Sequence, residues 1–312
     1  MHHEPQLTIG LPIYNPGEFL EPALQSIFAQ TFQDWELIVV DDNSDDGSVE
    51  LLSRFQDSRV RVLKCGSKRG LAARLNQIVL AARAPYLARM DADDMMDDNR
   101  LEKQVNFLWG HSDVDVVGCG LAILDRQGQP SGLRLFGTEH ATICADTLDG
   151  VHLAHATVVG KTEWFRQHPY NEENLSCEDW ELWFGSYDTS RFANLCEPLY
   201  YYREFASFSI RKYIDAKCRM ARLQWRRRAD FRLLRTSRVC LSQYVRILLN
   251  LFAYAGGLQS HMIRRRSKPI DQDTRAHVLA ATEKILNLAL PLKRTSPSVS
   301  TKFVSHPRNV FI

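Results

Sequence analysis

The N-terminal part of the chain alternates between short apolar runs and segments whose apolar residues recur every three or four positions. Four runs have the length and apolar content of β-strands, namely LTIGLPIY (7–14), ELIVV (36–40), RVRVL (59–63) and PYLARM (85–90). The segments between them, EFLEPALQSIFAQ, SVELLSRFQ and GLAARLNQIVLAAR, have the spacing of amphipathic helices. This order of elements predicts an α/β fold with a mostly parallel, doubly wound, Rossmann-like sheet, whose ligands bind beyond the carboxyl ends of the strands.

The pattern changes further along the chain. DVDVVGCGLAIL (113–124) predicts another strand, and GVHLAHATVVG (150–160), SCEDWELWFGSYD and CEPLYYYREFASFS are rich in the polar groups and rings that line binding sites. From about residue 211 the chain has helical spacing and many basic residues. We therefore expect two parts, residues 1–210 and a basic helical extension over residues 211–312.

The net charge of +2 conceals a difference between these two parts. Residues 1–210 hold 17 Lys and Arg against 32 Asp and Glu, a net charge of −15, whereas residues 211–312 hold 22 against 5, a net charge of +17. A strongly basic segment is typical of proteins that meet phosphate, either on nucleic acid or on an anionic membrane. The charge distribution therefore indicates different roles for the two parts.

The most apolar piece of the extension is YVRILLNLFAYAGGL (244–258). It is shorter than the roughly 20 apolar residues that span a bilayer, and it contains Arg246. We expect it either to lie in a membrane interface, flanked by basic clusters at residues 226–228 and 264–266, or to pack as a core helix. The C-terminal end, with PLKRTSPSVSTKF, is expected to form a flexible tail.

Two features of the chain predict its compartment. Seven cysteines, none of them in a C-x-x-C pair, argue against a disulfide framework. The first residues, MHHEPQLTIG, lack the cationic start and long apolar segment of a secretion signal. Both features favour a protein of the reducing cytosol.

Acidic residues gather where two of the predicted strands end. Asp41 and Asp42 follow the strand at 36–40, and Asp91, Asp93 and Asp94 follow the strand at 85–90. Because parallel strands end at one edge of a sheet, we expect both groups to face one crevice. Two carboxylates two residues apart can share a divalent metal with the phosphates of a nucleotide. For Asp45 and Asp46 an Asx-rich turn that caps the next helix explains the sequence equally well.

Six motifs follow one another along the chain: LPIYN, VVDDNSDDGS, KRGLAARLN, MDADD, EDWELW and YYR. In this order they resemble the family 2 glycosyltransferases with the A-type nucleotide-sugar fold, over about residues 6–210. The resemblance implies transfer of a sugar from a nucleoside diphosphate sugar, with a UDP-sugar expected, to a hydroxyl group, with inversion at the anomeric carbon. The basic extension lies outside the shared pattern.

The resemblance places a set of residues around the donor: Pro12, Tyr14, Asn15, Asp42, Arg69, Gly70, Asp91 and Arg203. It makes Asp42 the acceptor of a hydrogen bond from the base, whereas Asp41 braces the turn. It also implies a divalent metal, Mn²⁺ or Mg²⁺, held by Asp93 and Asp91, with His155 as a further candidate ligand. Lys68 departs from the asparagine that the family often has, and for Arg69 and Arg74 an exposed position on a helix is the alternative.

The resemblance places the reaction at EDWELW. Asp179 is implied as the catalytic base, because a single displacement with inversion needs one group to take the proton of the acceptor hydroxyl. Glu178 is expected to hold an acceptor hydroxyl, and Trp180 to offer a ring face to a sugar. Core packing is the alternative for Trp180 and the expected role of Trp183. After YYR, the sequence EFASFS departs from the family pattern.

The expected function is that of a metal-dependent inverting glycosyltransferase of bacterial surface polysaccharide, lipopolysaccharide or O-antigen synthesis. We expect a cytoplasmic protein, peripheral at the inner face of the cytoplasmic membrane, where basic residues meet anionic lipid and the acceptor is a glycan or lipid-linked saccharide. A sugar nucleotidyltransferase is one alternative, but it needs a Gly-rich basic loop where LPIYNPGEF offers Gly17 alone. A nucleic-acid-binding protein is another, but nucleic acid leaves the acidic crevice without a role.

Overall fold

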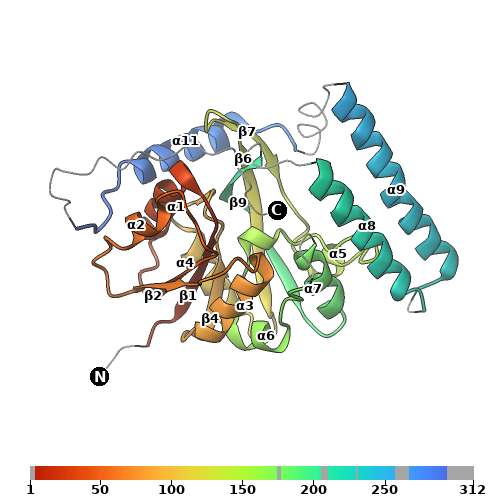
Figure 1. Cartoon of the computed structure of the whole chain (residues 1–312), viewed down its shortest axis with the longest axis horizontal. Helices are drawn as coiled ribbons and strands as arrows, with labels where there is room; N and C mark the ends of the chain where they lie inside the picture. Colours follow the sequence, from red (N-terminus) through yellow and green to blue (C-terminus); the bar gives the residue numbers. More distant parts are fainter. Residues whose placement is uncertain (1–3, 174–176, 205–209, 230, 257–266, 294–312) are drawn as a thin grey trace.

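The computed structural model describes residues 4–173, 177–204, 210–229, 231–256 and 267–293. Its centre is a nine-stranded sheet in the order β3-β2-β1-β4-β8-β6-β9-β5, with β7 paired to β6 (Figure 1). The strands are β1 (Leu7–Ile13), β2 (Trp35–Asp41), β3 (Val60–Lys64), β4 (Tyr86–Arg89), β5 (Met95–Met96), β6 (Val116–Leu124), β7 (Pro130–Arg134), β8 (Val159–Lys161) and β9 (Phe192–Arg203). The predicted tail and the basic residues 264–266 lie outside the described residues.

The first four strands are parallel, as the sequence predicts: β1 pairs with β2 and β4, and β2 pairs with β3. Beyond β4 the sheet is mixed, because β8 runs antiparallel to both β4 and β6, whereas β9 runs parallel to β6. The segment 150–160 is a strand only at its end, since residues 155–157 form a 3₁₀ turn before β8 begins.

Helices cover both faces of the sheet (Figure 1). They are η1 (Gly17–Phe19), α1 (Leu20–Phe28), α2 (Ser48–Leu52), α3 (Leu71–Ala81), α4 (Arg100–Gly110), α5 (His140–Ile143), η2 (His155–Thr157), α6 (Thr162–Gln167) and α7 (Glu178–Ser186). The C-terminal part adds α8 (Ile210–Arg226), α9 (Leu233–Ala255) and α11 (Gln272–Leu286). The helix predicted from SVELLSRFQ is shorter than expected, and α2 ends at Leu52.

The run of apolar residues in β2 is explained by its burial on both faces. Leu37 and Val39 pack into the hydrophobic core with α1 and α4, and Ile38 and Val40 pack into the core with α3, α6 and α7. Successive side chains of a strand point to opposite faces, so a central strand needs apolar residues at every position. Gly10 lets α3 approach β1 closely, since a Cβ atom there would lie 2.6 Å from Cγ2 of Ile78.

The predicted extension is divided in the structure. Helices α8 and α9 lie side by side next to α7, at the edge of the molecule (Figure 1). Residues 267–293 return to the sheet instead, where α11 packs beside α1 and Gln25 Nε2 donates hydrogen bonds to the carbonyls of Leu286 and Leu288. The sequence boundary at residue 210 therefore separates α8 and α9 from the sheet, but not α11.

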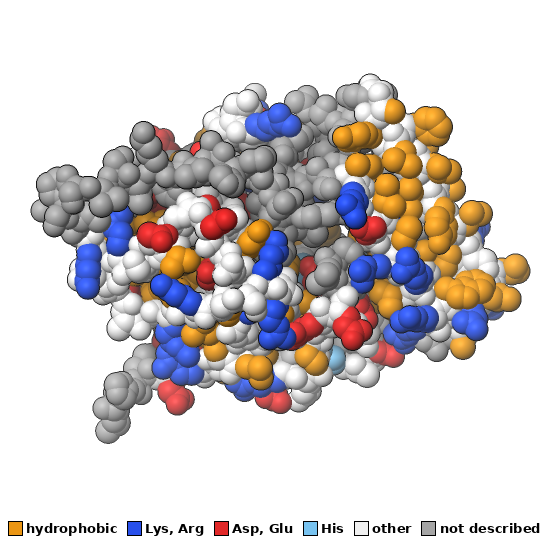
Figure 2. Space-filling view, viewed as in Figure 1, with side chains coloured by type: hydrophobic (Ala, Val, Ile, Leu, Met, Phe, Trp, Pro, Cys, Tyr) orange, Lys and Arg blue, Asp and Glu red, His pale blue; other side chains and the backbone are white. Residues whose placement is uncertain are grey.

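The surface of α9 is apolar. Its buried residues include the polar Thr236, Gln243 and Asn250, and Arg235 and Arg238 near its start are exposed. Its exposed large apolar side chains are Leu233, Leu234, Leu241, Tyr244, Val245, Leu248, Leu249, Leu251, Phe252 and Tyr254. Figure 2 shows these hydrophobic side chains as a continuous area along the helix, with Lys and Arg beside it. Among the described residues, no helix has the length and hydropathy needed to cross a membrane.

Candidate active site

The ends of β1 and β4 and the start of α3 enclose a small hollow. It is lined by Pro12, Tyr14, Pro16, Leu71, Asp91, Ala92 and Asp93. Four of the residues that the sequence assigns to the donor or the metal, from two separate motifs, therefore meet in one place. Because β1 and β4 are adjacent and parallel, their carboxyl ends open on the same edge of the sheet.

The acidic turn after β2 fastens two loops together. Asn15 Nδ2 donates to Asp45 Oδ1 at 2.8 Å, and the Asp45 amide donates back to Asn15 Oδ1 at 2.9 Å. Asp46 accepts from the Gly17 amide at 2.6 Å and from the Ser48 amide at 3.1 Å, at the start of α2. Asp45 and Asp46 therefore form the Asx-rich turn that the sequence offered as the alternative to a ligand-binding role. Asn15 has a positive φ of 50° and joins this turn to the loop after β1.

Asp42 holds the loop before α3. Its carboxylate accepts from the amides of Arg69, at 2.7 Å, and Gly70, at 3.0 Å. Arg74 Nε donates to the same carboxylate at 2.7 Å, and both side chains are almost fully buried. Arg74 is therefore an internal ion-pair partner and not an exposed helix residue. Contact of Asp42 with a base stays a prediction, because the loop at Arg69 and Gly70 covers the carboxylate.

Three carboxylates form a compact cluster after β4. Ligand oxygens of Asp91, Asp93 and Asp94 all lie within 4.8 Å of one another. Burial and the neighbouring Asp91 raise the pKa of Asp93 to about 7, and burial with both neighbours raises the pKa of Asp94 well above its usual range. Asp94 Oδ2 is buried and has no hydrogen-bond partner in the described part of the chain. These residues fit a hard divalent cation, which would relieve the repulsion among them.

His155 lies outside this cluster. Its Nε2 is 2.7 Å from the hydroxyl of Tyr170, and its ring meets that of Trp183 edge to face. Burial and the nearby Arg89 lower the pKa of His155 well below its usual range, so the ring is neutral at neutral pH. The sequence did not single out Tyr170. Metal binding by His155 stays a prediction that this geometry does not support.

Arg89 connects the two acidic regions, and sequence reasoning missed it. It is only 4% exposed, and its guanidinium pairs with both oxygens of Asp91, at 2.8 and 3.1 Å. Its positive charge also offsets part of the rise that burial causes in the pKa of Glu178 and of Asp179. The signal was present in PYLARM, because a buried arginine at the end of an apolar strand is rare unless it is paired.

Glu178 and Asp179 begin helix α7. Burial and the adjacent Asp179 raise the pKa of Glu178 to about 7, and burial raises the pKa of Asp179. Asp179 is partly exposed, and its Oδ1 accepts from the Trp180 amide at 2.7 Å. The charge of Asp91 also acts on Glu178, so the start of α7 lies within electrostatic range of the cluster after β4.

The two tryptophans of EDWELW both lie in the interior. Trp183 is 2% exposed, which confirms its expected core role. Trp180 is 8% exposed and stacks on Phe184 with ring centres 4.4 Å apart, in an apolar cluster that includes Met220 of α8. Sugar binding by Trp180 therefore stays a prediction without support from its packing.

The two arginines that the sequence assigns to the donor lie in different surroundings. Arg203 Nη1 donates to the Asp93 carbonyl at 2.6 Å, and its amide donates to Asp94 Oδ1 at 2.8 Å. Arg203 is therefore next to the acidic cluster. Arg69 is 59% exposed and pairs with Glu172.

The chain is similar in sequence to a known protein family and to individual bacterial proteins. Residues 8–181 match the family described as Glycosyl transferase family 2. The chain is 31% identical over 211 residues to a Bacillus subtilis (strain 168) protein named as glycosyltransferase EpsE, covering 65% of this chain and 75% of EpsE. It is 31% identical over 102 residues to the UDP-Glc:alpha-D-GlcNAc-diphosphoundecaprenol beta-1,3-glucosyltransferase WfgD of Escherichia coli, covering 33% of this chain and 40% of WfgD.

A solved structure has the same architecture. S. aureus TarS 1-349 in complex with UDP-GlcNAc superposes with a TM-score of 0.59, covering 90% of this chain and 80% of that one. The sequence identity of this pair is 17%, so the likeness shows the fold alone. It confirms the α/β fold predicted from the alternation of strands and helices.

Proposed function

Because the chain belongs to the family 2 glycosyltransferases, we propose that it is an inverting, metal-dependent enzyme that uses a UDP-sugar as its donor. The proposed acceptor is a hydroxyl of a glycan or lipid-linked saccharide in bacterial surface polysaccharide synthesis. The name of WfgD includes UDP-Glc, which supports the choice of nucleotide. Family membership decides against the alternative of a sugar nucleotidyltransferase.

One observation carries the proposal: the acidic cluster after β4 and the carboxylates that begin α7 both lie within electrostatic range of one buried arginine, Arg89. Its ion pair with Asp91 is buried, and its charge acts on Asp179. A displacement with inversion needs the leaving group and the base on opposite sides of one carbon atom. We propose that the acidic cluster after β4 holds a metal at the leaving group, and that a carboxylate at the start of α7 takes the proton on the other side of that carbon.

On the donor side, we propose that Asp93 and Asp91 hold the metal. A divalent cation there would neutralise the charge that develops on the leaving diphosphate. Arg203, hydrogen-bonded to the Asp93 carbonyl, places a second positive charge next to the same group.

The base side of the donor would lie between two fastened loops. Pro12 and Tyr14 line the hollow directly. We propose that Asn15, Asp42, Arg69 and Gly70 shape the base site, because their hydrogen bonds fix the loops after β1 and before α3. Gly70 has a φ of 90°, a conformation that favours glycine and that presents its amide to Asp42.

On the acceptor side, Asp179 is the proposed base. The acceptor oxygen forms a bond to the anomeric carbon as the bond from that carbon to the diphosphate breaks, and Asp179 takes the hydroxyl proton. The raised pKa of Asp179 makes its carboxylate a stronger proton acceptor. Glu178, whose pKa is about 7, is proposed to hold the acceptor by a hydrogen bond.

We propose that α9 docks on the anionic inner face of the cytoplasmic membrane. Ten large apolar side chains of α9 are exposed, and residues 211–312 carry a net charge of +17, a combination typical of interfacial helices. Nucleic acid would bind the basic residues through its phosphates but would leave the apolar side chains of α9 exposed. Flotation with anionic vesicles, with RNA as competitor, decides between them: loss of lipid binding with RNA retained would support the nucleic-acid alternative.

A thermal-shift screen of nucleoside diphosphate sugars, with and without manganese, tests the donor proposal. A ligand at 100 times its dissociation constant stabilises the folded state by about 2.7 kcal/mol. We expect a UDP-sugar to raise the melting temperature more with manganese than with EDTA, and Asp93→Ala to lose the metal-dependent part. A protein that no nucleoside diphosphate sugar stabilises under either condition would contradict the proposal.

A further inference from the structure

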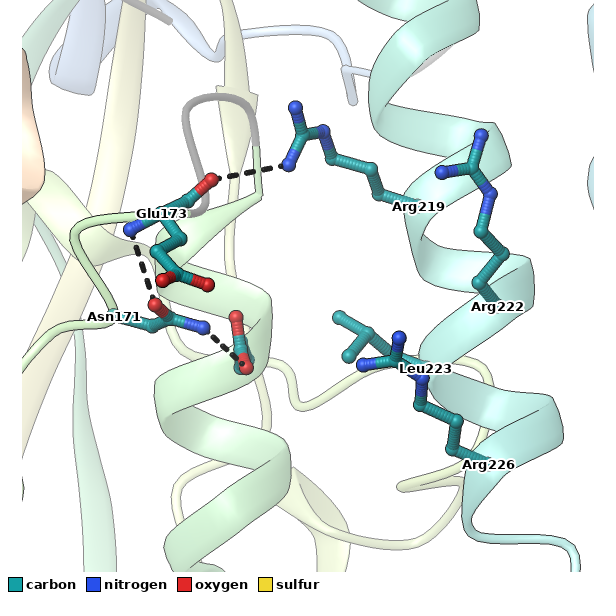
Figure 3. Close-up of a pocket in the computed structure, with 7 residues that line it drawn as sticks. Asn171, Glu173, Arg219, Arg222, Leu223 and Arg226 are labelled. Carbon is teal, nitrogen blue, oxygen red and sulfur yellow. Dashed lines mark hydrogen bonds between the residues drawn. The ribbon is translucent and has the colours of Figure 1, made fainter.

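A second pocket lies between α7 and α8, outside the hollow described above. It is lined by Asn171, Glu173, Glu181, Arg219, Arg222, Leu223 and Arg226. The three arginines are three and four residues apart on α8, so they lie on one side of that helix. Figure 3 shows Arg219 and Arg226 extending from α8 toward α7, with Arg222 between them along the helix.

Two of these guanidinium groups have no partner within the described part of the chain. Arg219 donates to the Glu173 carbonyl at 3.2 Å, and Asn171 Nδ2 donates to Glu181 Oε1 at 3.1 Å. Neither Arg222 nor Arg226 forms a hydrogen bond or ion pair with a described residue, although the pocket contains two glutamates. A pocket with three arginines and two glutamates keeps an excess of positive charge, and paired guanidinium groups match the oxygens of phosphate groups.

The position of the pocket relates it to the proposed reaction. Helix α7 begins with Glu178 and Asp179, and Glu181 of the pocket follows Glu178 by three residues, on the same side of the helix. On its other side the pocket is formed by α8, which packs against α9, the helix that carries the exposed apolar side chains. The pocket therefore lies between the proposed base and the proposed membrane-facing helix.

We propose that Arg219, Arg222 and Arg226 bind the diphosphate of a lipid-linked acceptor. The lipid chain would follow the apolar surface of α9 into the membrane, and the saccharide would extend past the start of α7 toward Asp179. This inference rests on the proposed function, because it assigns the anionic part of that acceptor to a site of its own. The donor diphosphate belongs to the separate cluster at Asp91 and Asp93.

Titration calorimetry with farnesyl diphosphate and with inorganic pyrophosphate tests this site. EDTA is included so that neither compound binds through a metal at Asp93. The test variant is Arg222→Gln/Arg226→Gln, which leaves the Arg219 hydrogen bond in place. The matched control is Arg232→Gln/Arg238→Gln, which removes the same charge from exposed residues outside the pocket. Because the test variant removes two charged hydrogen-bond donors from the pocket, we expect it to bind both compounds at least about tenfold more weakly.

The outcomes separate the possible sources of phosphate. Loss of both diphosphates in the test variant, with the control and the binding to phosphatidylglycerol vesicles unchanged, supports a diphosphate site. An equal loss in both variants overturns it, because net charge alone would then explain binding. Loss of vesicle binding with farnesyl diphosphate binding intact also overturns it, in favour of a lipid headgroup. Failure of the donor proposal is recognised separately, because UDP-sugar binding depends on residues that these variants leave unchanged.

Discussion

Helices α3 and α9 are both amphipathic, but they use their apolar faces in opposite ways. In α3 the apolar residues Ala72, Leu75, Ile78 and Val79 are buried against β1 and β2. In α9 the buried residues include three polar ones, and the leucines lie on the surface. A helix normally turns its apolar face toward the core. The difference indicates that α3 serves the fold, whereas the apolar face of α9 serves a partner outside the chain.

The same contrast holds for charge. In the sheet domain, the ionised groups next to the candidate site are buried and paired, as in the ion pairs of Arg74 with Asp42 and of Arg89 with Asp91. On α8 the arginines at 222 and 226 are exposed and make no ion pair with a described residue. Buried pairs fix the shape of a site, whereas exposed cations remain available to a ligand. We therefore assign the donor chemistry to the first region and recognition of the acceptor carrier to the second.

The largest effect is expected for Asp179→Asn. A positioned base contributes about 10²- to 10⁴-fold to the rate, so transfer should fall by that factor while UDP-sugar binding stays nearly unchanged. Single-turnover transfer and titration calorimetry measure the two properties separately. Normal turnover by this variant would refute the assignment of the base.

A similarly large effect on stability is expected for Arg89→Leu. Removal of one partner from a buried ion pair costs about 3–5 kcal/mol, because the remaining charge is left unpaired. The free energy of unfolding from urea titration measures this loss. Arg191→Leu is the control, since Arg191 and its partner Asp113 are 59% and 60% exposed, and an exposed pair contributes less than about 1 kcal/mol. Equal losses in the two variants would show that the ion pair of Arg89 with Asp91 does not behave as a buried pair.

Alanine substitutions compare the two amphipathic helices directly. Ile78→Ala in α3 should lower the free energy of unfolding by about 2–5 kcal/mol, because Ile78 is 1% exposed. Leu248→Ala in α9 should change it by less than about 0.5 kcal/mol, because Leu248 is 56% exposed. Leu248→Ala should also weaken flotation with anionic vesicles. A large loss of stability from Leu248→Ala would mean that α9 packs against the rest of the chain.

The smallest effect concerns pH. The pKa of Glu178 is about 7 in the folded protein, against an ordinary value of 4.5. Between these values the folded protein binds more protons than the unfolded chain, so stability falls as the pH rises from about 4.5 to about 7. In EDTA, Glu178→Gln should reduce this fall by about 1–3 kcal/mol, whereas Glu163→Gln, at an exposed residue, should leave it unchanged. Thermal unfolding at pH 5 and pH 7 is the measurement, and equal slopes in the two variants would count against the burial of Glu178.

The sequence predicted the parts of the fold that depend on local pattern. The apolar runs of β1 and β2 and the helical spacing of α3 were sufficient, because burial on two faces and burial on one face leave different periodicities. It also predicted that Asp91 and Asp93 lie at the carboxyl end of a strand, at the edge of the sheet where the hollow is found. Parallel strands make this prediction possible, since their carboxyl ends share one edge.

The sequence did not predict features that depend on contacts between distant segments. The burial of Asp42 depends on Arg74, 32 positions later, and the burial of Trp180 depends on the packing of α8 against α7. The return of α11 to the sheet also depends on distant contacts, such as that of Gln25 with the carbonyl of Leu286. No periodicity within a segment encodes which distant segment will cover it, so these features became visible only in the structure.

The central claim is that the hollow at Asp91 and Asp93 and the start of α7 form one active site. A crystal structure of the protein with UDP and manganese tests it most directly. The account predicts the metal on Asp91 or Asp93, the diphosphate beside Arg203 and the Asp179 carboxylate facing the diphosphate across an open space. Binding of UDP at another place, or a diphosphate with Asp179 pointing away from it, would contradict the account.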